Sequence, residues 1–147
     1  MPTLEKIRAI FDLIGQGRKE EFFENVDDNV DWTVKGKTLI IIHLSRTYCP
    51  ISGHYSSKQA FHDGTHALSS TWATPLKLVV QDIIHDGKNK AAVELKAVGV
   101  ECKNGLKFPN EYVWVCHFND QDKIIKINAF MDTDLVTRAI QQNPPKI

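Results

Sequence analysis

The sequence predicts an α+β domain in which helices pack against one face of a curved, mainly antiparallel sheet. Two observations predict this class. Helical patterns occupy the start, the middle and the end of the chain, and from Leu76 to Met131 segments rich in β-forming residues follow one another with short polar turns between them. The 147 residues, 42% of them hydrophobic, fit a single domain over residues 1–147 with one core.

The first quarter of the chain predicts two helices and a strand. Thr3 is a suitable N-cap for the first helix, which is expected to end at Gly15. The apolar positions of this helix recur with helical period: Leu4, Ile7, Ile10, Phe11 and Ile14. A short second helix is predicted over residues 19–23, and the alternating β-formers of Val30–Val34 predict a strand.

Residues 37–49 interrupt this pattern and are interpreted as an insertion. Their Leu39–Leu44 core has the composition of an additional strand. It could pack on the edge of the domain or in a dimer contact, and the alternative is a flap that covers a pocket.

The remaining chain predicts a helix, a meander and a closing helix. The middle helix spans about 58–70, after which Pro75 marks the exit. Four strands follow: Leu76–Ile84, Lys90–Glu101, Phe108–Phe118 and Lys123–Met131. Their short turns imply antiparallel neighbours. The last helix is expected over 133–142, and the tail 143–147 is expected to fray.

Charge and composition exclude several classes of partner. Lys and Arg together number 18, as do Asp and Glu, so no net field favours nucleic acid or an acidic membrane surface. Apolar runs such as Leu39–Ile42 are far too short to span a bilayer. Three cysteines without CxxC spacing, and no signal-peptide pattern, favour reduced thiols in the cytoplasm. We therefore expect neither a nucleic-acid nor a membrane partner.

The last two predicted strands carry most of the candidate chemistry. Alternation places four residues on one face of the first: Asn110, Tyr112, Trp114 and Cys116. It places three on one face of the second: Asn128, Phe130 and Asp132. If the first face is concave, the two sets meet around a ligand. Cys116 has no activating base nearby in the sequence and is interpreted as a core thiol.

Acid–base groups can be assigned on this basis, each with a structural alternative. Asp132 is the candidate general base, and its alternative role is to cap the last helix. Tyr112 and Tyr55 are candidate hydrogen-bond donors to an oxyanion, or phenols buried only for packing. His54 is a candidate acid–base partner at the pocket rim, or merely exposed.

Four residues are predicted to shape the ligand wall: Trp32, Asn110, Trp114 and Phe130. For Trp32, a simple core position is the alternative.

One further motif suggests a metal. His62-Asp-Gly-Thr-His66 places two imidazoles four residues apart, as in helical zinc sites. Gly64 weakens the helix, Asp replaces the usual Glu, and no third ligand is evident. A solvated helix flank is the favoured interpretation, and no metal is expected.

Four short motifs, in order, resemble the SnoaL-like family: Trp32–Gly36, Pro50–Tyr55, Asn110–Trp114 and Phe130–Val136. That family belongs to the superfamily of ketosteroid isomerase, scytalone dehydratase and nuclear transport factor two. The resemblance, over about 4–140, implies a cone-shaped half-barrel whose sheet wraps around the N-terminal helix, with an apolar pocket at its open end. It also implies a homodimer through the outer sheet face and catalysis without a cofactor. The chain departs from the family in the insertion at 37–49, and in Ala129, where many relatives carry Glu.

The leading expectation is therefore a cofactor-independent acid–base enzyme of isomerase, cyclase or dehydratase type. Its substrate would be a small hydrophobic carbonyl-bearing metabolite of polyketide or terpenoid kind. The first alternative is a non-catalytic protein of the same fold that binds a small molecule. The second is a zinc-dependent enzyme that uses His62 and His66.

Overall fold

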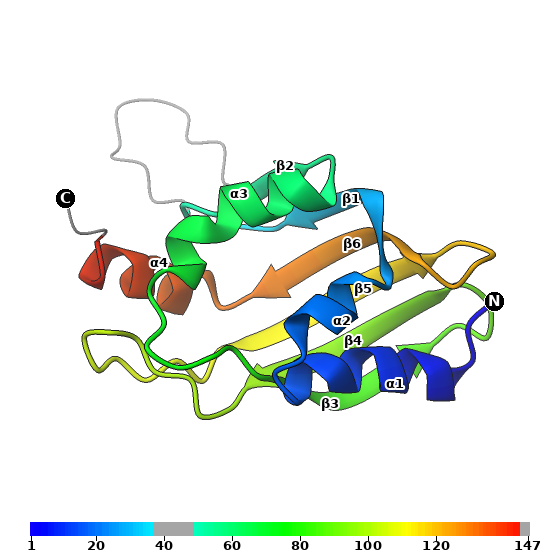
Figure 1. The fold of residues 1–147 in the computed structure, drawn as a ribbon, viewed down its shortest axis with the longest axis horizontal. Helices are drawn as coiled ribbons and strands as arrows, with labels where there is room; N and C mark the ends of the chain where they lie inside the picture. Colours follow the sequence, from blue (N-terminus) through cyan, green and yellow to red (C-terminus); the bar gives the residue numbers. More distant parts are fainter. Residues whose placement is uncertain (37–48, 145–147) are drawn as a thin grey trace.

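The computed structural model describes residues 1–36 and 49–144, and within them six strands form one mixed sheet. The strands are β1 (Val26–Val34), β2 (Gly53–Tyr55), β3 (Leu78–His85), β4 (Lys90–Ala97), β5 (Glu111–Phe118) and β6 (Ile124–Met131). Their order is β2-β1-β6-β5-β4-β3, and the sheet is not closed (Figure 1). β3 to β6 form the predicted antiparallel meander, whereas β1 joins β6 in parallel.

Four helices accompany this sheet in the described residues: α1 (Leu4–Gly15), α2 (Lys19–Phe23), α3 (Lys58–Ser69) and α4 (Thr133–Gln142). Figure 1 shows α1, α2 and α3 on one side of the sheet, with α4 near the end of β6. α1 packs on β3, and α3 packs on β1. The predicted α+β class, with helices on one face of the sheet, is confirmed. None of these helices is long and apolar enough to cross a membrane.

Helix α1 forms where the sequence predicts it, because its cap and its apolar stripe agree. The Thr3 side chain accepts a hydrogen bond from the backbone N–H of Lys6, at 3.1 Å. The residues that face the sheet are all buried: Ile7, Ile10, Phe11 and Ile14. Burial of each such side chain contributes roughly 1.5–3 kcal/mol, so this stripe anchors the helix layer to the sheet.

The segment between β4 and β5 departs from the prediction, which extended β4 to Glu101 and began β5 at Phe108. β4 ends at Ala97, and Gly99 takes a left-handed φ of 68° that turns the chain. The chain then forms an antiparallel bridge between Trp72 and Cys102. The segment between β4 and β5 therefore packs over the end of α3 and does not extend the sheet.

Two other segments were predicted differently. β2 is a short strand in a place where the sequence indicated only a turn, and it pairs with β1. Asn143, predicted to fray, is held because its amide donates to the Ala139 carbonyl at 2.8 Å and accepts from Asn104 N at 2.9 Å. The predicted extra strand at Leu39–Leu44 and the residues 145–147 lie outside the described residues.

Candidate functional site

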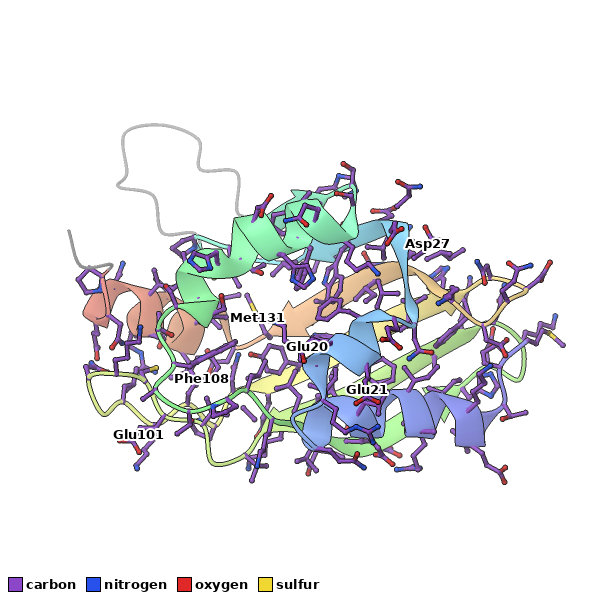
Figure 2. The ribbon with its side chains drawn as sticks, viewed as in Figure 1. Glu20, Glu21, Asp27, Glu101, Phe108 and Met131 are labelled. Atoms are coloured by element: carbon purple, nitrogen blue, oxygen red, sulfur yellow. The ribbon has the colours of Figure 1, made fainter. Side chains whose placement is uncertain are left out.

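An apolar pocket of about 90 Å³ lies between the helix layer and the inner face of the sheet. Seven aromatic side chains line it: Phe22, Phe23, Trp32, Phe61, Trp72, Tyr112 and Trp114. All three tryptophans of the chain are among them. Met131, at the end of β6, also lines it, and Figure 2 shows this residue beside α3. Lined in this way, the pocket suits a ligand with a flat apolar surface.

The wall of the pocket is a continuous aromatic stack built from β1, α3 and β5. Trp32 is fully buried, and its ring is nearly parallel to that of Phe61, with 3.7 Å between the centroids. Trp114 meets Trp32 edge-on at 5.3 Å, and Tyr112 meets Trp114 edge-on at 6.1 Å. Trp32 and Trp114 therefore both line the pocket.

Tyr112 brings a hydroxyl into this apolar setting. Burial raises the pKa of Tyr112 far above its ordinary value, and the neighbouring Asn110 amide has a smaller, opposite effect. The phenol therefore keeps its proton and acts as a donor. Asn110 is completely buried but does not line the pocket, and its side chain has no hydrogen-bond partner among the described residues. The effect of Asn110 on the phenol reflects proximity rather than a well-formed hydrogen bond.

The prediction that Phe130 and Asn128 share the face of Tyr112 is wrong. In the antiparallel register of β5 and β6, Met131 lies opposite Tyr112, and Phe130 lies opposite Val113. Residues directly opposite each other project to the same side of a sheet, so Phe130 lies on the outer face. There it is 46% exposed. The inner positions of β6 belong to Ala129 and Met131.

Asp132 lies outside the apolar pocket. It is the N-cap of α4, where its carboxylate accepts a hydrogen bond from Leu135 N at 3.1 Å. Its side chain is exposed and borders a separate surface hollow with Leu106 and Pro109. This geometry corresponds to the capping role rather than to a base inside a dry pocket.

Tyr55 lies outside the pocket lining. Its hydroxyl donates to the Ile51 carbonyl at 2.5 Å, and its ring packs against the backbone of Gly64 in α3. Partial burial raises the pKa of Tyr55. Tyr55 is not among the described residues that line the pocket, and it joins β2 to α3.

His54 also lies away from the pocket. It pairs with Thr33 across β1 and β2, on the side of the sheet opposite Trp32. Its side chain is 59% exposed and contacts the Asp31 carboxylate at 2.6 Å. The structure therefore does not bring His54 and Tyr112 together.

The two histidines of α3 do not form a metal centre in the described part of the chain. His62 packs on the ring of Phe23, with centroids 4.4 Å apart, and His66 is exposed in the last turn. Residues 1–36 and 49–144 contain no group of three or more His, Cys, Asp or Glu side chains arranged to hold a metal. Burial raises the pKa of the Cys116 thiol, as expected of an inert core cysteine.

Several pocket residues were not identified from the sequence. Phe23 and Lys19, from the short helix α2, line the pocket and complete its opening. The adjacent phenylalanines Phe22 and Phe23 were the available signal, since a short helix that carries two large apolar side chains in succession is expected to cover an apolar surface. Lys19 is the only charged side chain in the described lining.

The comparisons with known proteins support the fold. No established protein-family profile matches the chain, and no curated protein matches it. Among solved structures, an NTF2-like protein from Burkholderia thailandensis superposes with a TM-score of 0.69 at 18% identity, covering 96% of this chain and 99% of its own. TerC, co-crystallised with polyporic acid, gives 0.67 at 14% identity, with 94% and 97% covered.

A protein from Rhodopseudomonas palustris, provisionally named an isomerase, gives a TM-score of 0.63 at 14% identity, with 97% and 99% covered. At such identities these likenesses concern the fold. They confirm the architecture that the resemblance to SnoaL-like proteins implied, which is the NTF2-like fold.

Proposed function

We propose that this NTF2-like chain binds a small, predominantly apolar ligand in the pocket between its helices and the inner sheet face. The observation that carries the proposal is the lining, in which seven side chains are aromatic and one of these seven, Tyr112, carries a buried phenol. Because an apolar ligand gains most from flat aromatic contacts, this lining favours ring-containing molecules. The Tyr112 hydroxyl would donate a hydrogen bond to a carbonyl of the ligand and so orient it.

Binding is favoured over acid–base catalysis because the predicted base is not in the pocket. Asp132 caps α4, and the described lining contains neither a carboxylate nor an imidazole. Isomerase-type chemistry is the second candidate. It is supported by Tyr112, whose retained proton and apolar surroundings suit it to stabilise an enolate oxygen. The provisional naming of one structural neighbour as an isomerase is in keeping with this candidate.

The binding proposal can be tested with the neutral fluorescent probe N-phenylnaphthylamine, using the three pocket tryptophans as internal reporters. The phenyl ring is expected to enter the pocket, quench the tryptophan emission and enhance the probe emission. Ala129→Leu adds three carbons within the pocket lining and should weaken binding at least tenfold.

The matched control for this test is Phe130→Leu. Phe130 is the next residue of β6 and faces the opposite way, so its variant should bind as the wild type does. Equal binding by both variants, or no binding by the wild-type protein, would refute the proposal.

We also propose that a second copy of the chain covers the outer sheet face. Three apolar side chains are exposed there, Val79, Ile84 and Phe130, and charged residues such as Lys96 and Glu111 lie around them. Burial of these apolar side chains against a second copy would favour association, and the charged residues between them could pair with those of the partner. Phe130→Glu is expected to convert a dimer to a monomer in sedimentation velocity. Leu4→Glu, which changes an exposed residue of α1, should remain dimeric.

A further inference from the structure

The opening of the pocket carries a positive charge, and no carboxylate among the described residues forms an ion pair with it. Lys19 is exposed and yet lines the pocket, which places it at the mouth. Its ammonium group lies 5.9 Å from the centroid of the Phe23 ring. Among the described residues Lys19 makes no ion pair, whereas nearby Arg18 pairs with Glu21 and Lys58 pairs with Asp28. The Lys19 charge is therefore available to a ligand.

A second cationic side chain, Lys58, contacts the backbone of the same residue, Phe23. Lys58 donates from its ammonium to the Phe23 carbonyl at 2.9 Å, and the His62 ring packs on the Phe23 ring. Burial lowers the pKa of His62, and the charges of Lys19 and Lys58 lower it further, against a smaller opposite effect of Asp63. The neighbouring charges therefore produce a net positive electrostatic potential at His62.

The described lining of the pocket contains no negatively charged side chain that would repel an anion. The other residues of the described lining that carry polar atoms in their side chains are Thr65, Ser69, Tyr112 and the three tryptophans, all of them uncharged. The acidic residues Glu20 and Glu21, labelled on α2 in Figure 2, do not line it. A volume of about 90 Å³ accommodates at most a single ring, so the rest of a larger ligand must reach the mouth.

From this arrangement we infer that the ligand is amphipathic, with an apolar ring that enters the pocket and an anionic group that pairs with Lys19 at the mouth. This inference rests on the proposed function and narrows its ligand class to aromatic acids and similar anions. A carboxylate, sulfonate or enolate would each satisfy the same contact. Lys19 then selects among apolar molecules by charge, while the aromatic wall supplies most of the binding free energy.

Two probes of nearly the same shape test the inference. Anilinonaphthalene sulfonate differs from N-phenylnaphthylamine essentially by its sulfonate group, so the ratio of their dissociation constants isolates the contribution of the charge. The wild-type protein should bind the sulfonate roughly fivefold more tightly than the neutral probe, the preference that one partly exposed ion pair supplies. The preference should decrease as the salt concentration rises.

Substitutions of Lys19 test whether this residue is the source of the preference for the charged probe. Lys19→Gln should reduce the ratio to about one, and Lys19→Arg should restore most of it. Lys88→Gln makes the same change of net charge in the turn between β3 and β4, and should keep the wild-type ratio.

The outcomes separate the two proposals. If the neutral probe binds in the pocket but the sulfonate has no advantage, or if Lys88→Gln removes the advantage as fully as Lys19→Gln, the anionic-ligand inference is overturned and the binding function stands. If neither probe binds, both are overturned.

Discussion

Gly64 in helix α3 provides a substitution for which helix propensity and packing predict opposite signs. On propensity alone, Gly64→Ala in a helix interior should stabilise the protein by roughly 1 kcal/mol. In the structure, however, a Cβ at this position would lie 2.8 Å from Cζ and 2.9 Å from Cδ1 of Tyr55, and closer still to Cε1. The ring of Tyr55 must therefore move.

The magnitude follows from what that movement disrupts. Overpacking at a well-packed contact costs roughly 1–3 kcal/mol. Displacement of the ring also breaks the hydrogen bond from the Tyr55 hydroxyl to the Ile51 carbonyl, which contributes roughly 1 kcal/mol. After the gain in helix propensity is subtracted, Gly64→Ala should lower the free energy of unfolding by roughly 1–3 kcal/mol.

Urea denaturation of a double-mutant cycle measures this directly. In a Tyr55→Leu background the obstructing ring is absent, so Gly64→Ala should become neutral or stabilising. Ala67→Gly, at an exposed position of the same helix, should cost roughly 1 kcal/mol and thereby calibrate propensity in α3. If Gly64→Ala stabilised the protein with Tyr55 in place, the role assigned to Tyr55 as the packing link between β2 and α3 would be refuted.

Three further predictions address residues that the sequence singled out. Asp132→Ala should lower the free energy of unfolding by roughly 1 kcal/mol, because the α4 cap is lost. Asp132→Ser, which can still cap the helix, should stay near the stability of the wild type. Loss of N-phenylnaphthylamine binding in either variant would argue against a purely capping role. Because the pKa of His62 is lowered on folding, the unfolded chain binds a proton first as the pH falls below 6.5, so this residue removes stability on acidification. An NMR titration should place the His62 midpoint below 6.5, and a midpoint at or above 6.5 would contradict the contacts described. Between about pH 7 and pH 5, the His62→Gln variant should lose less stability than the wild type. Purified protein should carry no stoichiometric zinc, and a chelator should leave its melting temperature unchanged, whereas zinc held by His62 and His66 would give the opposite result.

Much of the fold could be predicted because the relevant signals are local. Thr3 and the stripe that includes Phe11 define α1 within a few residues of sequence. Alternation within β5 placed Tyr112 and Trp114 together on one face, because residues two apart in a regular strand point to the same side, and the structure shows that this face is the buried one.

The predictions that failed depend on how segments far apart in the sequence pack against one another. The buried face of β6 depends on its register with β5, which shifts between His117 and Phe118. Alternation placed Phe130 on one face with Asn128 and Asp132, and this face was expected to meet that of Tyr112, but the register places Phe130 on the outer face. Similarly, Lys19 lies beside a pocket only because α2 folds over the sheet, and no pattern within α2 indicates a mouth.

Tyr55 and Asp132 show a different limit of sequence reasoning. Both residue types can serve catalysis or structure, and what decides is the group that each contacts. Tyr55 donates to a backbone carbonyl, and Asp132 accepts from a backbone N–H at a helix start. Such contacts are common for these residue types, and here they favour the structural alternative in each case.

The central claim, that the pocket under the helices is where a ligand binds, is tested most directly by a ¹⁵N-resolved NMR titration with N-phenylnaphthylamine. The indole N–H signals of Trp32, Trp72 and Trp114 all report on the pocket, and the side-chain amide of Asn128 reports on the outer sheet face. Saturable shifts of all three indole signals, with an unmoved Asn128 signal, are the predicted result. Unmoved indoles, or shifts confined to Asn128, would contradict the account.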